Sequence, residues 1–146
     1  MEPDILKEID EAILAGNNAL YYLERAKKVL GSASGWGVAD MIGGGMFISM
    51  IKRRKMQEAR EEMVRAKDAL DDLVREIRDL DMYFDLDLDT DGFLEFADVF
   101  FDHFLIDWMA QSKIRHARDQ VDDAIRETES VLDTLGELRE EYECTE

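Results

Sequence analysis

The fold is decided by the stretch from Val38 to Leu80, which reads VADMIGGGMFISMIKRRKMQEAREEMVRAKDALDDLVREIRDL. Moved forward by 58 residues, this stretch lies over Phe96 to Leu138, and the apolar positions match almost throughout although identity is low. An internal repeat of this kind identifies the structural unit of a chain. The sequence therefore predicts a duplicated helical unit, with copies at 35–80 and 93–142, behind an N-terminal helix at 4–30.

Apolar residues recur at alternating spacings of three and four in all three segments, which is the pattern of coiled-coil seams. In the first copy the stripe is Met56, Ala59, Met63, Ala66, Leu70, Leu73, Ile77 and Leu80. In the second copy it is Ile114, Ala117, Val121, Ala124, Thr128, Val131, Leu135, Leu138 and Tyr142. In the N-terminal segment it is Leu6, Ile9, Ile13, Gly16, Leu20, Leu23, Lys27 and Leu30. The predicted fold class is all-α, a single domain of long antiparallel helices in a coiled-coil-like bundle.

Two breaks separate the predicted helices. Asp4 can cap the start of the first helix, and the run from Gly31 to Gly35 predicts its end, because glycine and small polar residues terminate helices. The second break is an acidic loop at 81–92. One long rod would then cover 38–80. Whether it continues through Gly43–Gly45 stays open, since each interior glycine costs a helix roughly 1 kcal/mol.

Composition limits the function classes. The 146 residues, 46% of them apolar, suffice for one domain with a real core. The formal net charge of −17 argues against nucleic acid, and against attraction of the whole molecule to anionic lipid. Cys144 is the only cysteine, which excludes an internal disulfide and a cysteine-based zinc site within one chain. The start of the sequence lacks a signal-peptide pattern, so we expect a cytoplasmic protein.

An apolar stretch at 35–51, followed by four basic residues at 52–55, suggests membrane contact. Three observations argue against a membrane span. The stretch has 17 residues, the short limit for a span, and it contains Asp40. Its repeat partner at 93–109 carries, among other polar residues, Asp98, Asp102, His103 and Asp107, which a bilayer would not accept cheaply. We therefore expect a buried helix, and a membrane-peripheral role is the second alternative.

The acidic loop continues into a sequence that resembles an EF-hand loop, DLDTDGFLEFAD from Asp87 to Asp98. The candidate ligands for Ca²⁺ or Mg²⁺ are Asp87, Asp89, Asp91, the carbonyl of Phe93, Glu95 and Asp98. Asp98 stands where EF-hands have a bidentate glutamate, which would weaken Ca²⁺ binding and favour Mg²⁺. The sequence holds no second loop of this kind. The competing interpretation is an acidic turn between helices, with Thr90 or Asp91 as N-cap.

The segment from Phe93 to Met109 is apolar around most of its circumference. In a hairpin of two long helices, the end next to the loop would contain only two helices. Two helices cannot bury such a segment, and large exposed apolar patches mark interfaces. The sequence therefore predicts a two-fold homodimer through Phe96, Phe100, Phe101, Phe104, Leu105 and Trp108. Sharp kinks near 52–55 and 110–113 would instead let the two apolar segments pack within one chain.

Two segments together resemble a family of small uncharacterised bacterial helical proteins: GWGVADMIGGG from Gly35, and FADVFFD from Phe96 with DWMAQSKI from Asp107. The resemblance covers most of residues 31–120. It implies a helical fold and brings no activity, substrate or catalytic residue with it.

The sequence offers no nucleophile–base set, so we assign no catalytic residue and expect no enzyme. The predicted function is a non-enzymatic helical-bundle scaffold or protein-interaction protein, homodimeric and with an unknown protein partner. A protein that binds Ca²⁺ or Mg²⁺ through the single EF-hand-like loop is the first alternative.

Overall fold

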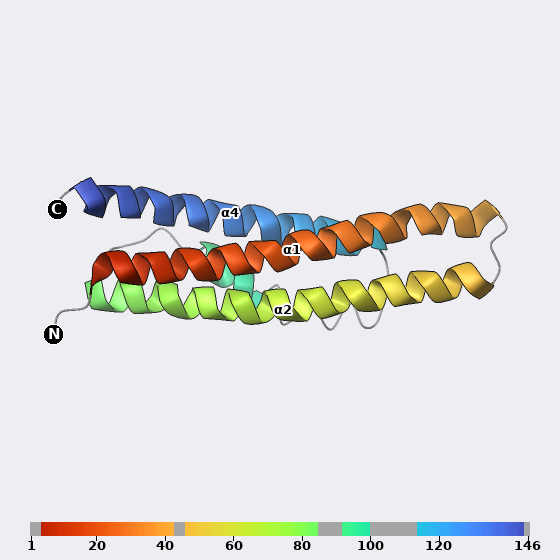
Figure 1. Ribbon diagram of the computed structural model, residues 1–146, viewed down its shortest axis with the longest axis horizontal. Helices are drawn as coiled ribbons and strands as arrows, with labels where there is room; N and C mark the ends of the chain where they lie inside the picture. The colour runs from red at the N-terminus through yellow and green to blue at the C-terminus, as the bar shows by residue number, and fades with distance from the viewer. Residues whose placement is uncertain (1–3, 43–45, 85–91, 100–113, 145–146) are drawn as a thin grey trace.

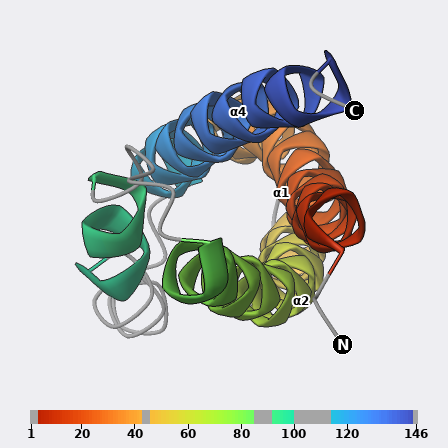
Figure 2. The ribbon, with the colours of Figure 1, turned by 90° about the vertical axis from the view of Figure 1, so that its left-hand side faces the viewer.

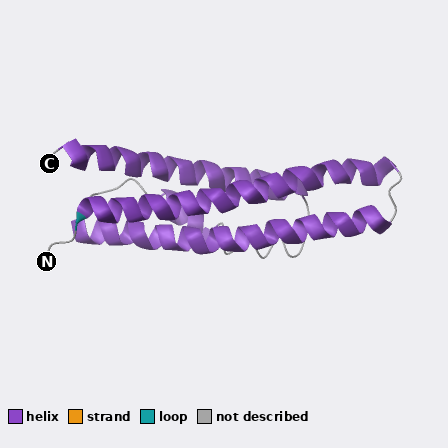
Figure 3. Cartoon of the chain, in the orientation of Figure 1, coloured by secondary structure: helices purple, strands orange, loops and turns teal. Residues whose placement is uncertain are grey.

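The computed structural model describes residues 4–42, 46–84, 92–99 and 114–144. Its helices are α1 (Ile5–Ile42), α2 (Met46–Phe84) and α4 (Ile114–Cys144), with a further helical segment at 92–99. Every described residue except Asp4 is helical (Figure 3). The predicted all-α fold class is therefore confirmed.

The helices form an elongated bundle in which α1 packs against both α2 and α4. Helix α1 runs antiparallel to both neighbours, and the two termini lie at the same end of the molecule (Figure 1). Viewed along the bundle, α4, α1 and α2 follow one another around the axis (Figure 2). The segment 92–99 lies away from α1, between α4 and α2 (Figure 2).

The core consists of one buried stripe on each long helix. The predicted stripe of α2 is confirmed from Ala59 to Leu80, and that of α4 from Val121 to Leu138. Tyr142 is half-buried against this core. The side chains of Met56, Ile114 and Ala117 lie outside those described. Six pairs of positions related by the 58-residue shift are buried in both helices: Met63/Val121, Ala66/Ala124, Leu70/Thr128, Leu73/Val131, Ile77/Leu135 and Leu80/Leu138. The duplication itself stays a prediction, because any two heptad helices can be aligned in this way.

The predicted stripe of α1 is partly wrong. The structure buries Ile9, Gly16, Leu23 and Leu30 as expected, but between them it buries Ala12, Ala19 and Ala26. Ile13 and Leu20 are only half-buried, at the edge of the core, and Lys27 is exposed. Helix α1 has a neighbour on each side, so small side chains occupy the centre of its buried face and larger ones flank it.

The predicted helix boundaries near the N-terminus are wrong. Helix α1 continues through Gly31–Gly35 to Ile42, and α2 begins at Met46, so the rod predicted over 38–80 is two helices. Isolated glycines within a long packed helix are tolerated at roughly 1 kcal/mol each. Three in a row concentrate that cost at 43–45, which lies outside the described residues. Helix α2 runs unbroken through 52–55.

This correction removes the premise of the predicted dimer. The end of the bundle that holds the C-terminal half of α2 contains three long helices instead of two, because the N-terminal half of α1 and the C-terminal half of α4 reach the same end (Figure 1). Residues 81–84 and 92 of the predicted acidic loop are helical, since α2 extends to Phe84 and the segment 92–99 is helical, and residues 85–91 lie outside the described residues. Phe93, at the start of the apolar segment, is buried in the chain's own core with 3% of its surface exposed.

Candidate functional site

The structure places only half of the predicted cation ligands. Asp87, Asp89 and Asp91 lie outside the described residues, whereas Glu95 and Asp98 are exposed on the helical segment 92–99. An EF-hand uses the backbone carbonyl at its seventh position, here Phe93, as a ligand. Within an α-helix that carbonyl points along the axis to the N–H four residues later. The described geometry at Phe93 therefore differs from an EF-hand, and cation binding by the aspartates stays a prediction.

The structure likewise describes one of the six predicted interface residues. Phe100, Phe101, Phe104, Leu105 and Trp108 lie outside the described residues. Phe96 is half-buried and packs against the core of its own chain. Val99, at the end of the same segment, is 55% exposed.

A carboxylate cluster that the sequence did not predict lies between α1 and α2. Glu8 and Glu11 on α1 and Glu76 on α2 each place a carboxylate oxygen within 4.8 Å of the others. Burial, followed by the charges of Glu11, Glu8 and Asp79, raises the pKa of Glu76, and Arg75 opposes the shift. Glu8 and Glu11 are three apart and share a helix face, but only tertiary packing brings Glu76 to them. These oxygens are close enough together to hold a hard cation between them.

Further along the same α1–α2 contact, opposite charges meet. Glu62 of α2 is a buried carboxylate whose side chain is 9% exposed. Its Oε1 accepts a hydrogen bond from Nη1 of Arg65 at 3.2 Å, and Nε of Arg25 lies 3.3 Å from its Oε2 as an ion pair. The geometry of that ion pair is not that of a hydrogen bond.

Arg25 is also held in place by a residue of its own helix, α1. Its Nη1 donates a hydrogen bond to the hydroxyl of Tyr21 at 3.1 Å, and its guanidinium lies 5.6 Å from the centre of that ring. The hydrogen bond to Tyr21, followed by the charge of Glu62, raises the pKa of Arg25. The Tyr21 ring packs edge-on against Tyr22, with ring centres 5.2 Å apart. A cation positioned by an aromatic ring thus neutralises the buried carboxylate.

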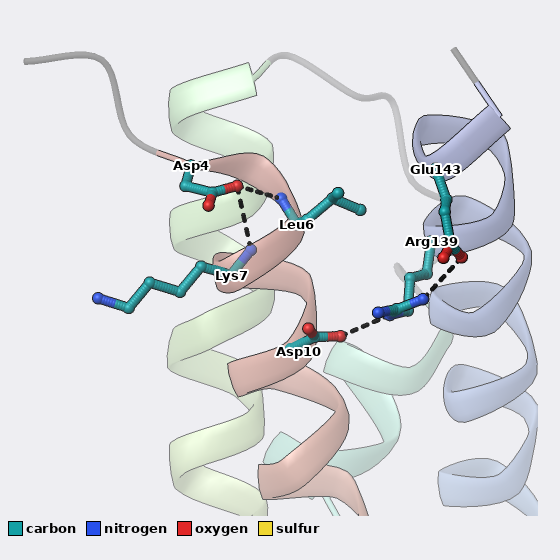
Figure 4. Close-up of polar contacts among 6 residues, drawn as sticks. All are labelled: Asp4, Leu6, Lys7, Asp10, Arg139 and Glu143. Atoms are coloured by element: carbon teal, nitrogen blue, oxygen red, sulfur yellow. Dashed lines mark hydrogen bonds and ion pairs between the residues drawn. The ribbon is translucent and has the colours of Figure 1, made fainter. Parts of the chain in front are cut away.

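The α1–α4 contact is bracketed by two ion pairs. Lys27 Nζ lies 2.9 Å from Asp122 Oδ1. Arg139 Nε donates a hydrogen bond to Asp10 Oδ1 at 2.6 Å, which Figure 4 shows. Arg139 Nη1 also donates to Glu143 Oε2 at 2.8 Å. Figure 4 further shows the predicted cap of α1, where Oδ1 of Asp4 accepts hydrogen bonds from the backbone N–H groups of Leu6 and Lys7.

Between these ion pairs the two helices approach closely. A Cβ atom added to Gly16 would lie 2.6 Å from Cδ2 of Leu132, so the absent side chain makes room for the leucine. The spacing of the apolar residues placed Gly16 in the buried stripe. The reason for a glycine there is Leu132, the α4 residue that faces it.

Among the described residues, no helix is both long and apolar enough to cross a membrane. Comparisons with family models, with curated proteins and with solved structures found no match to this chain.

Proposed function

We propose that this protein is a non-enzymatic helical-bundle scaffold that acts through protein–protein contacts. The observation that carries the proposal is the chemical composition of the described core. The buried ones are apolar except for Glu62 and Thr128, and both of these have polar partners. The Thr128 hydroxyl donates to the carbonyl of Ala124 at 2.8 Å, and Glu62 is paired with arginines. The described core thus serves to hold three long helices in register.

We further propose that the scaffold is a homodimer that pairs through the outer face of the segment beginning at residue 93. Support comes from the two faces of this segment. Phe93 and Ala97 are buried in the core, whereas Val99 is exposed and adjoins the predicted interface residues in sequence. An exposed apolar side chain at this point extends the apolar surface that the sequence predicts.

The test is the mass of the full chain by light scattering during size-exclusion chromatography, for the unmodified protein, Val99→Glu and Leu14→Glu. Leu14 is the matched control, because it is 62% exposed on α1, away from the segment 92–99. We expect twice the 16.9 kDa of one chain for the unmodified protein and for Leu14→Glu, and a shift towards one chain for Val99→Glu. A monomer at every concentration would refute the dimer.

Divalent-cation binding is the second function that we propose. Its support is two separate groups of carboxylates: Glu95 and Asp98, exposed on the segment 92–99, and the cluster of Glu8, Glu11 and Glu76 between α1 and α2. The experiment is calorimetric titration of metal-stripped protein with Ca²⁺ and then Mg²⁺, beside Asp87→Ala, Asp89→Ala and Glu76→Gln. Saturable binding lost in both aspartate variants and kept in Glu76→Gln assigns the loop. Loss in Glu76→Gln alone assigns the α1–α2 cluster, and no heat at millimolar cation refutes both.

A further inference from the structure

The outer side of the α1–α4 contact has an uneven distribution of charge. Charged residues make up 36% of the chain, but α1 has none from residue 12 to residue 23. Within this run Leu14 and Tyr21 are 62% and 55% exposed, and the exposed Asn17 lies between them. Spacings of three and four residues place these three side chains on one face of the helix. Helix α1 therefore presents a short uncharged row to solvent, with an aliphatic side chain at one end and an aromatic ring at the other.

Tyr21 is held in a fixed orientation by its neighbours. Its hydroxyl accepts the hydrogen bond from Arg25, and its ring packs edge-on against Tyr22. A side chain that is ordered before binding loses little conformational entropy when a partner covers it. Tyrosine is also one of the residues that contribute most of the binding energy at protein interfaces. Tyr21 thus has the properties of an interface anchor.

The register of the two helices places one part of α4 beside this row. The ion pairs of the contact join residues 10 and 27 of α1 to residues 139 and 122 of α4. Residues 12–23 of α1 therefore lie level with about 126–137 of α4. None of the described segments covers this side in the view along the bundle (Figure 2). The row and this part of α4 thus form one surface that faces solvent.

This part of α4 carries carboxylates without cationic partners. Between Arg126 and Arg139, helix α4 has four acidic residues and no basic one. Glu129 lies one heptad after Asp122, which contacts α1, and Asp133 follows one turn later. Glu129 and Asp133 are both exposed, and neither forms an ion pair with another described residue. Because α1 has no charge at this level, it does not neutralise them.

We propose that the outer α1–α4 face docks a basic amphipathic helix of a partner protein. This face consists of Leu14, Asn17 and Tyr21 on α1 and of Glu129 and Asp133 on α4. Amphipathic helices dock through side chains at positions i, i+3, i+4 and i+7, which matches the spacing of the α1 row. Lysine or arginine side chains beside these anchors then pair with the α4 carboxylates. The inference rests on the scaffold function proposed above and names the class of its partner.

Charge selects this occupant over two others. A neutral or acidic helix would remove Glu129 and Asp133 from water without supplying a cation. A second copy of this chain would bring its own net charge of −17 to the same surface. The ion pairs that bound the face lie 17 residues apart on each helix, from 10 to 27 and from 122 to 139, which is about 25 Å at 1.5 Å per residue. A docked helix of about 17 residues therefore covers the face.

The first test uses a synthetic helical peptide of about 17 residues, with leucines at heptad spacing on one face and lysines beside them. Fluorescence anisotropy measures its binding to the full unmodified chain, to Leu14→Glu and to Met82→Glu. Met82 is the matched control, because it is 70% exposed on α2 and its replacement adds the same charge. We expect Leu14→Glu to weaken binding by about tenfold through loss of an anchor, and Met82→Glu to leave it unchanged.

This comparison separates docking from attraction by net charge. Both variants are more acidic than the unmodified protein, so attraction alone would make both bind the cationic peptide at least as tightly. Binding of Leu14→Glu as tight as that of the unmodified protein would therefore overturn the proposal. Leu14 is exposed, so its replacement leaves the core intact, which circular dichroism checks.

The second test removes charge from α4. Glu129→Gln/Asp133→Asn should weaken peptide binding by about fivefold, since two exposed ion pairs are lost. Glu61→Gln/Asp68→Asn is the control, because it removes the same charge from two exposed residues of α2. Equal losses in the two double variants would show that only the total charge matters and would overturn the proposal.

The remaining outcomes distinguish this inference from the scaffold function. No binding of the peptide to the unmodified chain at low salt would overturn the docking of a basic helix. The scaffold proposal would survive that result, because the mass of the full chain and of Val99→Glu tests it separately. A lower mass of Leu14→Glu by light scattering would show that a second copy covers the face, and would overturn the proposed occupant.

Discussion

Helix α1 makes two kinds of contact with its neighbours. Against α4, the two interhelical ion pairs, Lys27–Asp122 and Asp10–Arg139, join opposite charges on either side of the close approach at Gly16. Against α2, Glu62 meets Arg25 at one level, whereas Glu76 meets Glu8 and Glu11 at another. The buried stripes are similar along both contacts. The difference teaches that the hydrophobic core sets which helices pair, while the flanking charges set where the pairing is weakest.

The largest expected effect on stability comes from replacing a glutamate by lysine at the two charged positions of the α1–α2 contact, Glu62 and Glu76. Glu62→Lys would bury a cation between Arg25 and Arg65 and should lower the free energy of unfolding by about 3 kcal/mol. Glu76→Lys would meet two glutamates and should raise it, by up to about 1 kcal/mol because these groups are partly exposed. Urea unfolding followed by circular dichroism measures both. Effects of the same sign would show that local charge does not distinguish the two levels.

A smaller effect is expected where α1 meets α4. Gly16→Leu should lower the free energy of unfolding by about 2 kcal/mol, because the new side chain collides with Leu132. Gly31→Leu is the control within the same helix. Among the described side chains, a Cβ at Gly31 meets nothing within 4 Å, and replacing glycine in a helix is favourable by up to about 1 kcal/mol. Chemical denaturation compares the two variants, and destabilisation by both would refute the close approach at Gly16.

The smallest effect is a pH dependence localised to Glu76. Its pKa is raised in the folded protein, so the folded state holds the proton more tightly than the unfolded chain does. Stability from this contact should therefore increase as the pH falls from neutral through the raised pKa towards the ordinary value of 4.5. The facing groups are Glu8, Glu11, Asp79 and Arg75. The difference in unfolding midpoint between the unmodified protein and Glu76→Gln should shrink over this range, and a constant difference would contradict the assignment.

Sequence reasoning succeeded where one dominant interaction decides the outcome. The stripes from Ala59 to Leu80 and from Val121 to Leu138 were predictable, because apolar residues at heptad spacing on an otherwise charged helix have one face to bury. The stripe of α1 was only half predictable. Two sets of apolar residues on α1 could face the core: the alanines Ala12, Ala19 and Ala26, and the larger Ile13 and Leu20. Which set lies at the centre depends on how many helices surround α1.

The turn position and the charged contacts were less predictable. Glycines occur both at 31–35 and at 43–45, and local preference alone does not say which group the helix passes through. Glu76 and Glu8 are far apart in the sequence and belong to different helices. No sequence pattern near either residue predicts that the two meet. Of the candidate sites, the sequence named the cation ligands, the interface aromatics and the apolar stretch at 35–51, whereas the Glu8–Glu11–Glu76 cluster emerged from the fold.

The sequence by itself determined the all-α class, the long helices and the buried stripes of α2 and α4, because each depends on short-range periodicity between residues a turn or two apart. The tertiary structure decided where the chain reverses, which face of α1 is central, and which charges meet across it. Those outcomes depend on the register between helices, since a shift of one turn leaves every local pattern intact and changes every contact between them.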